Sequence, residues 1–528
     1  MPDVVDDPVG AAWLMRHYGI ALPGRLRVTS RIGGRRMTQT DGVVSRETWV
    51  EAMRPAPHPA AHLQFHLRHE VPHLDFLARL FAASGPDIVQ NWVAEEPTGR
   101  YARRAAFLYE WLTGRMLQVP PRSGGNYVDA IDAARLVAAS PDQVQKVARW
   151  RVNDNLPGTR HFCPILVRTP AMVQAAALDV SALFKDLAAE FGEDLLLRAA
   201  AWLTLRESRS SFAIEGEAAQ ATRIQRFADV MARRTGQGEV PLDDAALALL
   251  QHEILGEKTV IGRFGLRQSP VFIGETSRYE NLVYYVAPPA EDLAPMLAGL
   301  RSFLMKTTGQ SPVMRAAVAA FGFVYIHPLA DGNGRVHRFL INDLLRRDGT
   351  IPAPVILPVS AVITDDPGER RAYDQVLDEV SAPLMQAMRD QISFRPTGTM
   401  YPDGIVSDIE INDPDMARPS WRYPDLAPHV VFLARILDRT IREQMRTESR
   451  YLRRHARART ALKEVVEMPD PQADRVLRMI DRNQGHLSNA LAREMPVLGE
   501  PGVWDELVAA VKRAWEEEEN SSAASRRV

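Results

Sequence analysis

The clearest hydrophobic pattern in the chain lies between residues 312 and 349. Pro312 precedes an uninterrupted apolar run of eleven residues, 316–326. A proline in the first turn and apolar residues on every side predict a buried helix over residues 312–326, which Pro328 ends. A short polar stretch follows, and then apolar residues recur at helical spacing, with a glycine placed to cap the end: Val336, Phe339, Leu340, Leu344 and Gly349. This pattern predicts a helix, a glycine-rich loop and a second helix.

A second pattern, over residues 267–287, predicts a β-hairpin. Two β-prone runs, 267–274 and 282–286, flank a polar turn. An exposed strand edge there would hold an extended peptide through backbone hydrogen bonds. The alternative is an ordinary hairpin packed on the core.

Elsewhere the patterns predict helices, so we expect an all-α fold with this single small hairpin. Three regions follow from the breaks between elements: an N-terminal helical region (1–195), a central region with all the strong motifs (196–395) and a C-terminal helical region (396–528). Residues 395–415, which contain three Pro, two Gly and several Asp, are expected to form a loop.

Composition limits the class of protein. The chain of 528 residues has a net charge of −2, which argues against a surface built throughout for nucleic acid. Of its 64 basic residues only six are Lys, and we attribute the excess of Arg to a GC-rich genome. Because Cys163 is the only cysteine, the chain has no intrachain disulfide. The first residues lack the features of a secretory signal, and the longest apolar run is too short to span a membrane. We therefore expect a cytoplasmic protein.

The loop after residue 326 carries the candidate chemistry. An Asp-Gly-Asn-Gly stretch at a helix start presents unpaired backbone N–H groups and the positive end of the helix dipole, which suits an anion. Arg335 and Arg338 lie three residues apart on one helix face and suit a polyphosphate. Asp331 is a hard oxygen ligand for Mg²⁺, and His327 can accept a proton from an attacking hydroxyl. The alternative is a surface loop of ordinary turns with solvated His and Arg side chains.

Residues 327–338 resemble the signature of the Fic family (filamentation induced by cyclic AMP), His-Pro-Phe-x-Asp/Glu-Gly-Asn-Gly/Lys-Arg-x-x-Arg, with Leu329 in place of the usual Phe. The resemblance implies a helical core that binds ATP with Mg²⁺ or Mn²⁺ and transfers AMP to a Tyr, Ser or Thr hydroxyl of a target protein. Gly334, where a kinase-like branch has Lys, favours AMP transfer over phosphate transfer. The resemblance also implies these roles: His327 as general base, Asp331 as metal ligand, Gly332, Asn333 and Gly334 as anion cradle, Arg335 and Arg338 as phosphate ligands, Val271, Phe272, Ile273 and Gly274 as the flap bordering the nucleotide, and Tyr373 near the adenine.

Ser211, Glu215 and Gly216 match the inhibitory motif of the same family, Ser/Thr-x-x-x-Glu-Gly/Asn. By itself this is a common helical pattern with a solvated Glu. The resemblance, to the long bacterial form, implies an inhibitory helix near residues 200–233 whose Glu215 competes with the ATP γ-phosphate for Arg338, so we expect an autoinhibited enzyme. Two alternatives remain: hydrolysis of AMP from a modified protein at the same site, and a regulatory protein that binds nucleotide without turnover. Homo-oligomerisation stays open, and we expect neither membrane nor nucleic acid as a partner.

Two further clusters have simpler interpretations. Five of the 13 histidines fall within sixteen residues: His58, His62, His66, His69 and His73. The last two complete a His-Glu-x-x-His string typical of zinc proteases, but Pro72 disfavours the continuous helix that such a site needs, and we expect a surface or packing role. Nine arginines between residues 435 and 459 are expected to form a solvated helical face.

Overall fold

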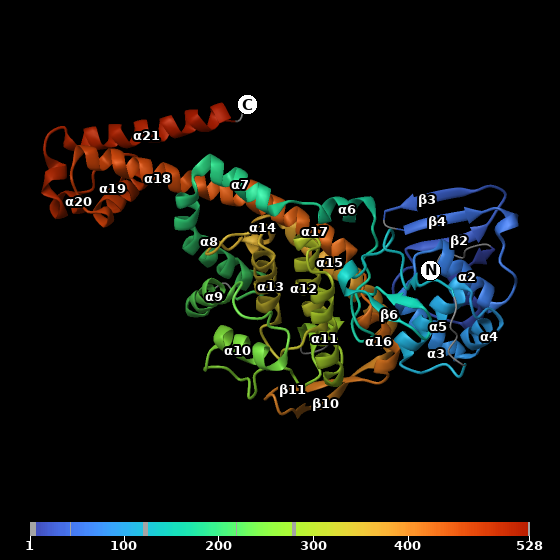
Figure 1. Ribbon diagram of the computed structural model, residues 1–528. Helices are drawn as coiled ribbons and strands as arrows, with labels where there is room; N and C mark the ends of the chain where they lie inside the picture. The colour runs from blue at the N-terminus through green and yellow to red at the C-terminus, as the bar shows by residue number, and fades with distance from the viewer. Residues whose placement is uncertain (1–6, 43, 120–124, 218, 277–280, 526–528) are drawn as a thin grey trace.

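The structure is a computed structural model that describes residues 7–42, 44–119, 125–217, 219–276 and 281–525. It is predominantly helical, with small sheets at its periphery (Figure 1). The helical fold class expected from the sequence is confirmed. Within the described residues, no helix combines the length and apolar character needed to cross a bilayer.

A central helical bundle surrounds α12 (Pro312–Ile326), whose residues are almost all buried. The Ser311 side chain accepts a hydrogen bond from the Met314 N–H at the start of α12, and Pro312 takes the first helical position, as the sequence predicts. Because α12 is apolar all round, other helices cover it on every side. The central bundle contains α6 (Pro170–Ala176), α7 (Val180–Phe191), α8 (Glu193–Ile214), α9 (Ala221–Arg234), α10 (Asp244–Leu255), α11 (Ala290–Lys306), α13 (Asn333–Arg347), α14 (Val359–Asp365), α15 (Pro367–Met388), α16 (Pro414–Arg422) and α17 (Ala427–Arg439).

The predicted hairpin is present as β8 (Phe272–Thr276) and β9 (Asn281–Val286), which pair antiparallel. The centre of its predicted turn, residues 277–280, lies outside the described residues. A second hairpin, β10 (Ile392–Met400) and β11 (Val406–Ile411), replaces the loop expected at 395–415. Pro396 and Gly398 lie where the register between β10 and β11 shifts, so the residues that argued for a loop mark a bulge within a strand.

The N-terminal region was expected to be mostly helical, and it also contains two sheets. One has the strand order β1-β2-β4-β3, and the other has the order β5-β7-β6. The strands β2, β3 and β4 of the first sheet are rich in Ser, Thr and charged residues, and those of the second sheet are only two or three residues long. Neither sheet therefore shows a clear alternation of apolar residues in the sequence. The elements of this region are β1 (Pro8–Val9), α1 (Ala11–Tyr18), β2 (Val28–Ile32), β3 (Met37–Asp41), β4 (Val44–Trp49), η1 (Glu51–Met53), α2 (Pro59–His69), α3 (Leu74–Ser84), α4 (Asp87–Glu95), α5 (Arg100–Thr113), β5 (Val128–Asp129), η2 (Pro141–Gln143), β6 (Gln145–Val147) and β7 (Val152–Asp154).

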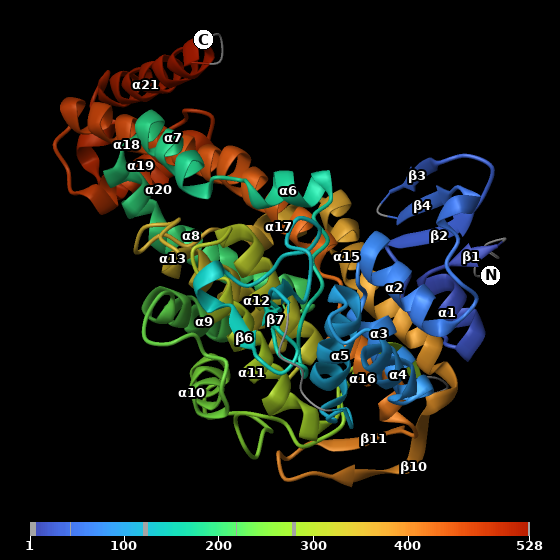
Figure 2. The ribbon, with the colours of Figure 1, turned by 45° about the vertical axis from the view of Figure 1, so that its right-hand side comes forward.

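The C-terminal residues form a small helical bundle that projects from the central bundle (Figures 1 and 2). Helix α17 continues through a π-helical segment, η4 (Thr440–Met445), into α18, which leads into a separate hydrophobic cluster. The remaining elements are η3 (Arg389–Gln391), α18 (Arg446–Val465), α19 (Asp470–Arg482), α20 (Asn489–Glu494), η5 (Pro496–Gly499) and α21 (Val503–Ser525).

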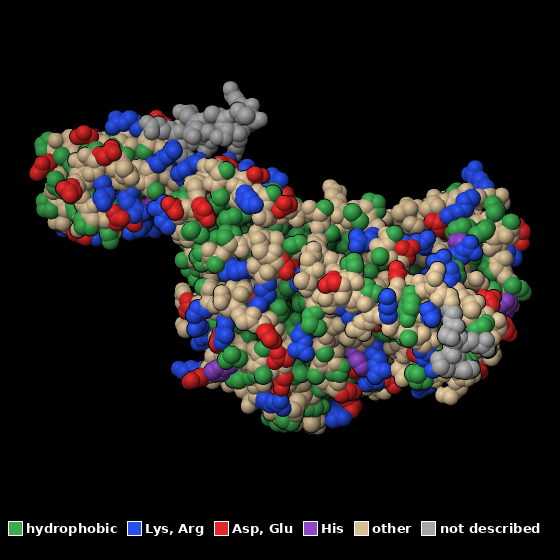
Figure 3. Space-filling model, viewed as in Figure 1, with side chains coloured by type: hydrophobic (Ala, Val, Ile, Leu, Met, Phe, Trp, Pro, Cys, Tyr) green, Lys and Arg blue, Asp and Glu red, His purple; other side chains and the backbone are tan. Residues whose placement is uncertain are grey.

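Many arginines of residues 435–459 are partly exposed, as expected of a solvated face, and they also form ion pairs within the chain. Arg435 and Arg439 pair with Glu369 of α15, Arg446 and Arg450 with Glu190 of α7, and Arg459 with Asp470 and Asp474 of α19. On the face shown in Figure 3, basic and acidic side chains are interspersed over the molecule. These arginines therefore tie α17 and α18 to neighbouring helices.

Candidate active site

The loop between α12 and α13 is closed by its own side chains. His327 ends α12 in the left-handed conformation (φ 48°), and Gly332 starts α13 with φ 92°. The Asn333 side chain accepts a hydrogen bond from the Leu329 N–H (3.0 Å) and donates one to the Leu329 carbonyl (2.7 Å). The amide of Asn333 is therefore committed to holding the shape of the loop, and its part in an anion cradle stays a prediction.

The imidazole of His327 is held as a neutral base. Its Nδ1 lies 3.2 Å from the Val324 carbonyl, which can only accept, so Nδ1 carries the proton and Nε2 keeps a lone pair. Burial, reinforced by the nearby Arg267 guanidinium, lowers the pKa of His327 to about 3. A neutral imidazole with a free Nε2 can accept a proton from a hydroxyl group.

Arg335 and Arg338 are both only 3% exposed by side chain, because the end of α8 covers them. The Glu215 carboxylate is paired with both: it bonds to Arg338, and its Oε2 lies 3.1 Å from Arg335 Nε. Ser211 Oγ accepts a second hydrogen bond from Arg338, 2.5 Å from Nε. The structure thus brings Ser211, Glu215 and the two arginines together, as the sequence predicts.

The carboxylate of Glu215 occupies the space beside Gly334. A Cβ atom built on Gly334 would lie 2.3 Å from Glu215 Oε1, so only glycine fits with the carboxylate in this place. Helix α8 stops at Ile214, and Gly216 (φ 77°) turns the chain away, so the helix expected over 200–233 is interrupted and Glu215 lies at its C-terminal end. A carboxylate among two guanidinium groups and a helix N-terminus marks an anion site filled by the chain itself.

Two neighbouring residues fix the position of α8. Both carboxylate oxygens of the buried Glu207 accept hydrogen bonds from Ser360 at the start of α14, 2.7 Å from its backbone N and 2.6 Å from its Oγ. Burial raises the pKa of Glu207 to about 7. Arg206 pairs with Asp365 at the end of α14 (2.7 Å) and with Glu448 of α18. Sequence reasoning missed these contacts, because a Glu and a Ser 153 positions apart carry no signal of their pairing in one sequence.

The flap residues lie on β8 or just before it, and Tyr373 lies in the core. Ile273 and Gly274 are exposed, and a Cβ on Gly274 would meet the Leu282 carbonyl oxygen at 2.0 Å, which explains the glycine. Tyr373 is only 6% exposed and packs among Phe321, His337 and Phe432. The nucleotide contacts expected of Val271, Phe272, Ile273, Gly274 and Tyr373 stay predictions.

Asp331 is the one loop carboxylate that fits a metal role. Its side chain is 52% exposed and lies 3.1 Å from Arg335 Nη2, at the edge of the anion site. Within the described residues, no group of three or more His, Cys, Asp or Glu side chains converges as a metal cage. A single exposed carboxylate beside an anion site suits Mg²⁺, which proteins hold through one or two carboxylates together with substrate phosphates.

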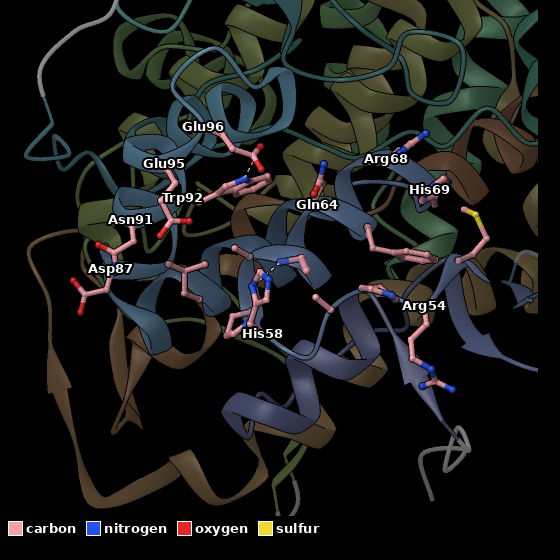
Figure 4. Close-up of a pocket in the computed structure, with 18 of the residues that line it drawn as sticks. Arg54, His58, Gln64, Arg68, His69, Asp87, Asn91, Trp92, Glu95 and Glu96 are labelled. Atoms are coloured by element: carbon pink, nitrogen blue, oxygen red, sulfur yellow. Dashed lines mark hydrogen bonds between the residues drawn. The ribbon is translucent and has the colours of Figure 1, made fainter. Parts of the chain in front are cut away.

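The histidine cluster makes packing and capping contacts. Helix α2 ends at His69 and α3 begins at Leu74, so the break expected at Pro72 is confirmed. His58 and His73 cap α2 and α3, and His66 bonds to the buried Glu70. A hollow of about 770 Å³ lies between α2 and α4, with Arg54 and Arg68 on one side of it and Asp87 and Glu95 on the other (Figure 4). Cys163 is buried, and burial raises the pKa of its thiol to about 12.

Comparison with known proteins places the signature in a family. Residues 241–345 match the model of the Fic/DOC family. A segment of 123 residues is 33% identical to protein adenylyltransferase fic-1 of Caenorhabditis briggsae, covering 23% of this chain and 22% of that protein. A segment of 122 residues is 34% identical to protein adenylyltransferase Fic of Drosophila grimshawi, covering 23% of each chain. The match therefore spans less than a quarter of the length of these relatives.

Among solved structures, a Fic family protein from Desulfovibrio desulfuricans aligns with a TM-score of 0.38 and 22% sequence identity. That alignment covers 61% of this chain and 90% of the other.

Proposed function

We propose that this chain, which carries a Fic domain at residues 241–345, transfers AMP from ATP to a hydroxyl side chain of a target protein. The single observation that carries the proposal is an anion site formed by Gly334, Arg335 and Arg338 in the first turns of α13, directly after the loop that begins at His327. The printed names of the relatives, protein adenylyltransferases, support the same chemistry. We take residues 196–395 as the catalytic unit.

In this mechanism each residue of the loop and of the start of α13 has one role. His327 Nε2 accepts the proton of the target hydroxyl as its oxygen attacks the α-phosphorus of ATP. The bond from the α-phosphorus to the bridging oxygen breaks, and pyrophosphate leaves with the electron pair. Arg335, Arg338 and the N–H groups at the start of α13 hold the phosphates and stabilise the developing charge. Mg²⁺ or Mn²⁺, held by Asp331 together with the phosphates, would neutralise part of that charge.

The same geometry supports autoinhibition. The carboxylate of Glu215 and a γ-phosphate would compete for Arg338, since both are anions that suit one guanidinium group. The contacts of Glu207 with Ser360 and of Arg206 with Asp365 keep α8 in the inhibiting position. Activation then requires α8 or its end to move away from α13.

Doubly labelled ATP tests the reaction class directly. We expect the Glu215→Gly protein, incubated with a cell lysate, to transfer label from the α-phosphate of ATP to protein and no label from the γ-phosphate. Protein-bound label should be accompanied by an equal amount of pyrophosphate. Transfer of the γ-label would instead indicate a kinase, and label in neither position would contradict transfer.

The pH dependence of transfer follows from the lowered pKa of His327. Because that pKa is about 3, the imidazole is already neutral at pH 5, and the base is competent throughout the range from pH 5 to 8. We therefore expect kcat/KM of the Glu215→Gly protein to change less than about twofold between pH 5.5 and 8, where an ordinary histidine would lose most of its activity on the acid side. A steady-state pH profile measures this, and an acid limb near pH 6.5 would contradict the assigned state of His327.

A further inference from the structure

We propose that Arg267 is a positioning residue for the transfer, holding the backbone of His327. The inference rests on the proposed function, because it assigns His327 the role of base. Arg267 belongs to the first stem of the flap and carries no role in the resemblance described above.

The first support is the set of contacts that the Arg267 guanidinium makes. The residue is 1% exposed, and its guanidinium donates hydrogen bonds to three backbone carbonyls. These are His327 O at 2.8 Å, Ser269 O at 2.8 Å and Pro288 O at 2.6 Å. One side chain thus connects the active-site loop to both stems of the β8–β9 flap.

The backbone on either side of this side chain reinforces the connection. The Arg267 N–H donates to the Pro328 carbonyl (2.9 Å), and Leu266 forms a β-bridge with Leu329. On the opposite side, the Asp403 carboxylate of the β10–β11 turn accepts from the N–H groups of Gln268 and Ser269 at 2.7 and 2.8 Å. The stem therefore lies fixed between the second hairpin and the loop.

The second support is the conformation of His327. Its φ of 48° is costly for a residue with a side chain, and it persists only where the surroundings determine it. The His327 N–H donates to Phe323 O (2.8 Å), which ends α12, and Arg267 holds the His327 carbonyl. Both backbone polar groups of His327 are thus committed, and the direction of its imidazole follows from them.

The third observation that supports the proposal is the positive charge of Arg267 next to His327. Arg267 is a buried cation whose hydrogen bonds in the described structure all go to neutral carbonyls. Burial is the main cause of the lowered pKa of His327, and the positive charge of Arg267 lowers that pKa further by disfavouring a second cation beside it. The other titratable groups at this point are Tyr285 of β9 and Tyr325 of α12, whose phenols burial keeps neutral by raising their pKa, and Asp403 beyond Arg267.

The test compares Arg267→Gln and Arg267→Lys in the Glu215→Gly background. Arg315→Gln is the matched control, because Arg315 is also a buried arginine that bonds to a backbone carbonyl, Leu304 O, but it lies at the first turn of α12. We expect Arg267→Gln to lower kcat about 100-fold with the Kd for ATP changed less than threefold, because a displaced base affects the chemical step. Arg315→Gln is expected to lower the melting temperature and leave kcat within about threefold.

Histidine-selective NMR titration supplies a readout that needs no activity. The His327 signal, assigned by its loss in His327→Ala, should titrate at a higher pH in Arg267→Gln than in the parent. Arg267→Lys keeps the positive charge but cannot make all three hydrogen bonds to the backbone carbonyls. His327 should therefore still titrate at low pH in this variant, and kcat should fall. If Arg267→Gln does not fold, Arg267→Lys tests the proposal instead. A lower kcat with an unchanged Kd for ATP in that variant would support a positioning role for Arg267.

Two results would overturn the proposal. One is an unchanged His327 titration in a folded Arg267→Gln protein, and the other is an equal loss of kcat in Arg315→Gln and the Arg267 variants. If no variant transfers AMP at all, but the NMR titration of His327 still changes in Arg267→Gln, the proposed function is wrong. The contact between Arg267 and His327 is then supported on its own.

Discussion

Replacing Glu215 by glycine is expected to raise the initial rate of AMP transfer about 10- to 100-fold over wild type. The carboxylate of Glu215 is paired with both Arg335 and Arg338 and fills the space beside Gly334, so its removal frees the anion site for phosphate. Incorporation of label from the α-phosphate of ATP into lysate protein, followed on a denaturing gel, measures the change.

Glu217→Gln is the matched control for this prediction. Its carboxylate lies 4.0 Å from Arg335, at the edge of the same cluster, and makes no described contact with Arg338. The control should therefore change the rate less than about threefold, as expected of a partly exposed charge pair. Equal rates in wild type and Glu215→Gly would show that the Glu215 contact does not restrain the enzyme.

Replacing His327 by alanine in the Glu215→Gly background is expected to lower transfer by about 10²- to 10⁴-fold, the contribution typical of a general base. Arg335 and Arg338, the proposed phosphate ligands, stay in place, so the affinity for ATP should change less than about threefold. Calorimetric titration with ATP and the label assay, run on the same preparation, separate the two effects.

The control for His327→Ala is His252→Ala, because His252 is an exposed histidine of α10 within the same matched segment. It should leave transfer within about twofold of the parent. A His327→Ala protein that still transfers AMP at more than about a tenth of the parental rate would contradict the role of His327 as base.

The sequence was most informative where local rules and a specific motif coincided. Pro312 and Pro328 mark the bounds of α12, and the structure has a helix over Pro312–Ile326. The glycines and polar residues after Pro328 predict a loop from the local sequence alone. These features depend on neighbours in the chain, which a single sequence displays.

What could not be predicted depends on contacts between distant residues. The pattern of α13 suggests that Arg335 and Arg338 face away from the apolar stripe, and no local rule indicates that α8 covers them. Only the resemblance of Ser211 and Glu215 to the inhibitory motif indicates that contact, which comes from more than 100 positions earlier. The roles of Arg267 and Glu207 arise in the same way, from partners 60 and 153 positions away. The β10–β11 hairpin was missed because Pro396 and Gly398 are breakers by local rules and are accommodated by a bulge.

The central claim is that Glu215 restrains AMP transfer at a site whose base is His327. Its most direct test is a parallel measurement of protein-bound AMP by wild type, Glu215→Gly, His327→Ala and the double variant, with pyrophosphate release counted in each. The account predicts strong labelling with matching pyrophosphate in Glu215→Gly alone. Labelling by the double variant at the level of Glu215→Gly, or wild-type labelling equal to Glu215→Gly, would contradict it.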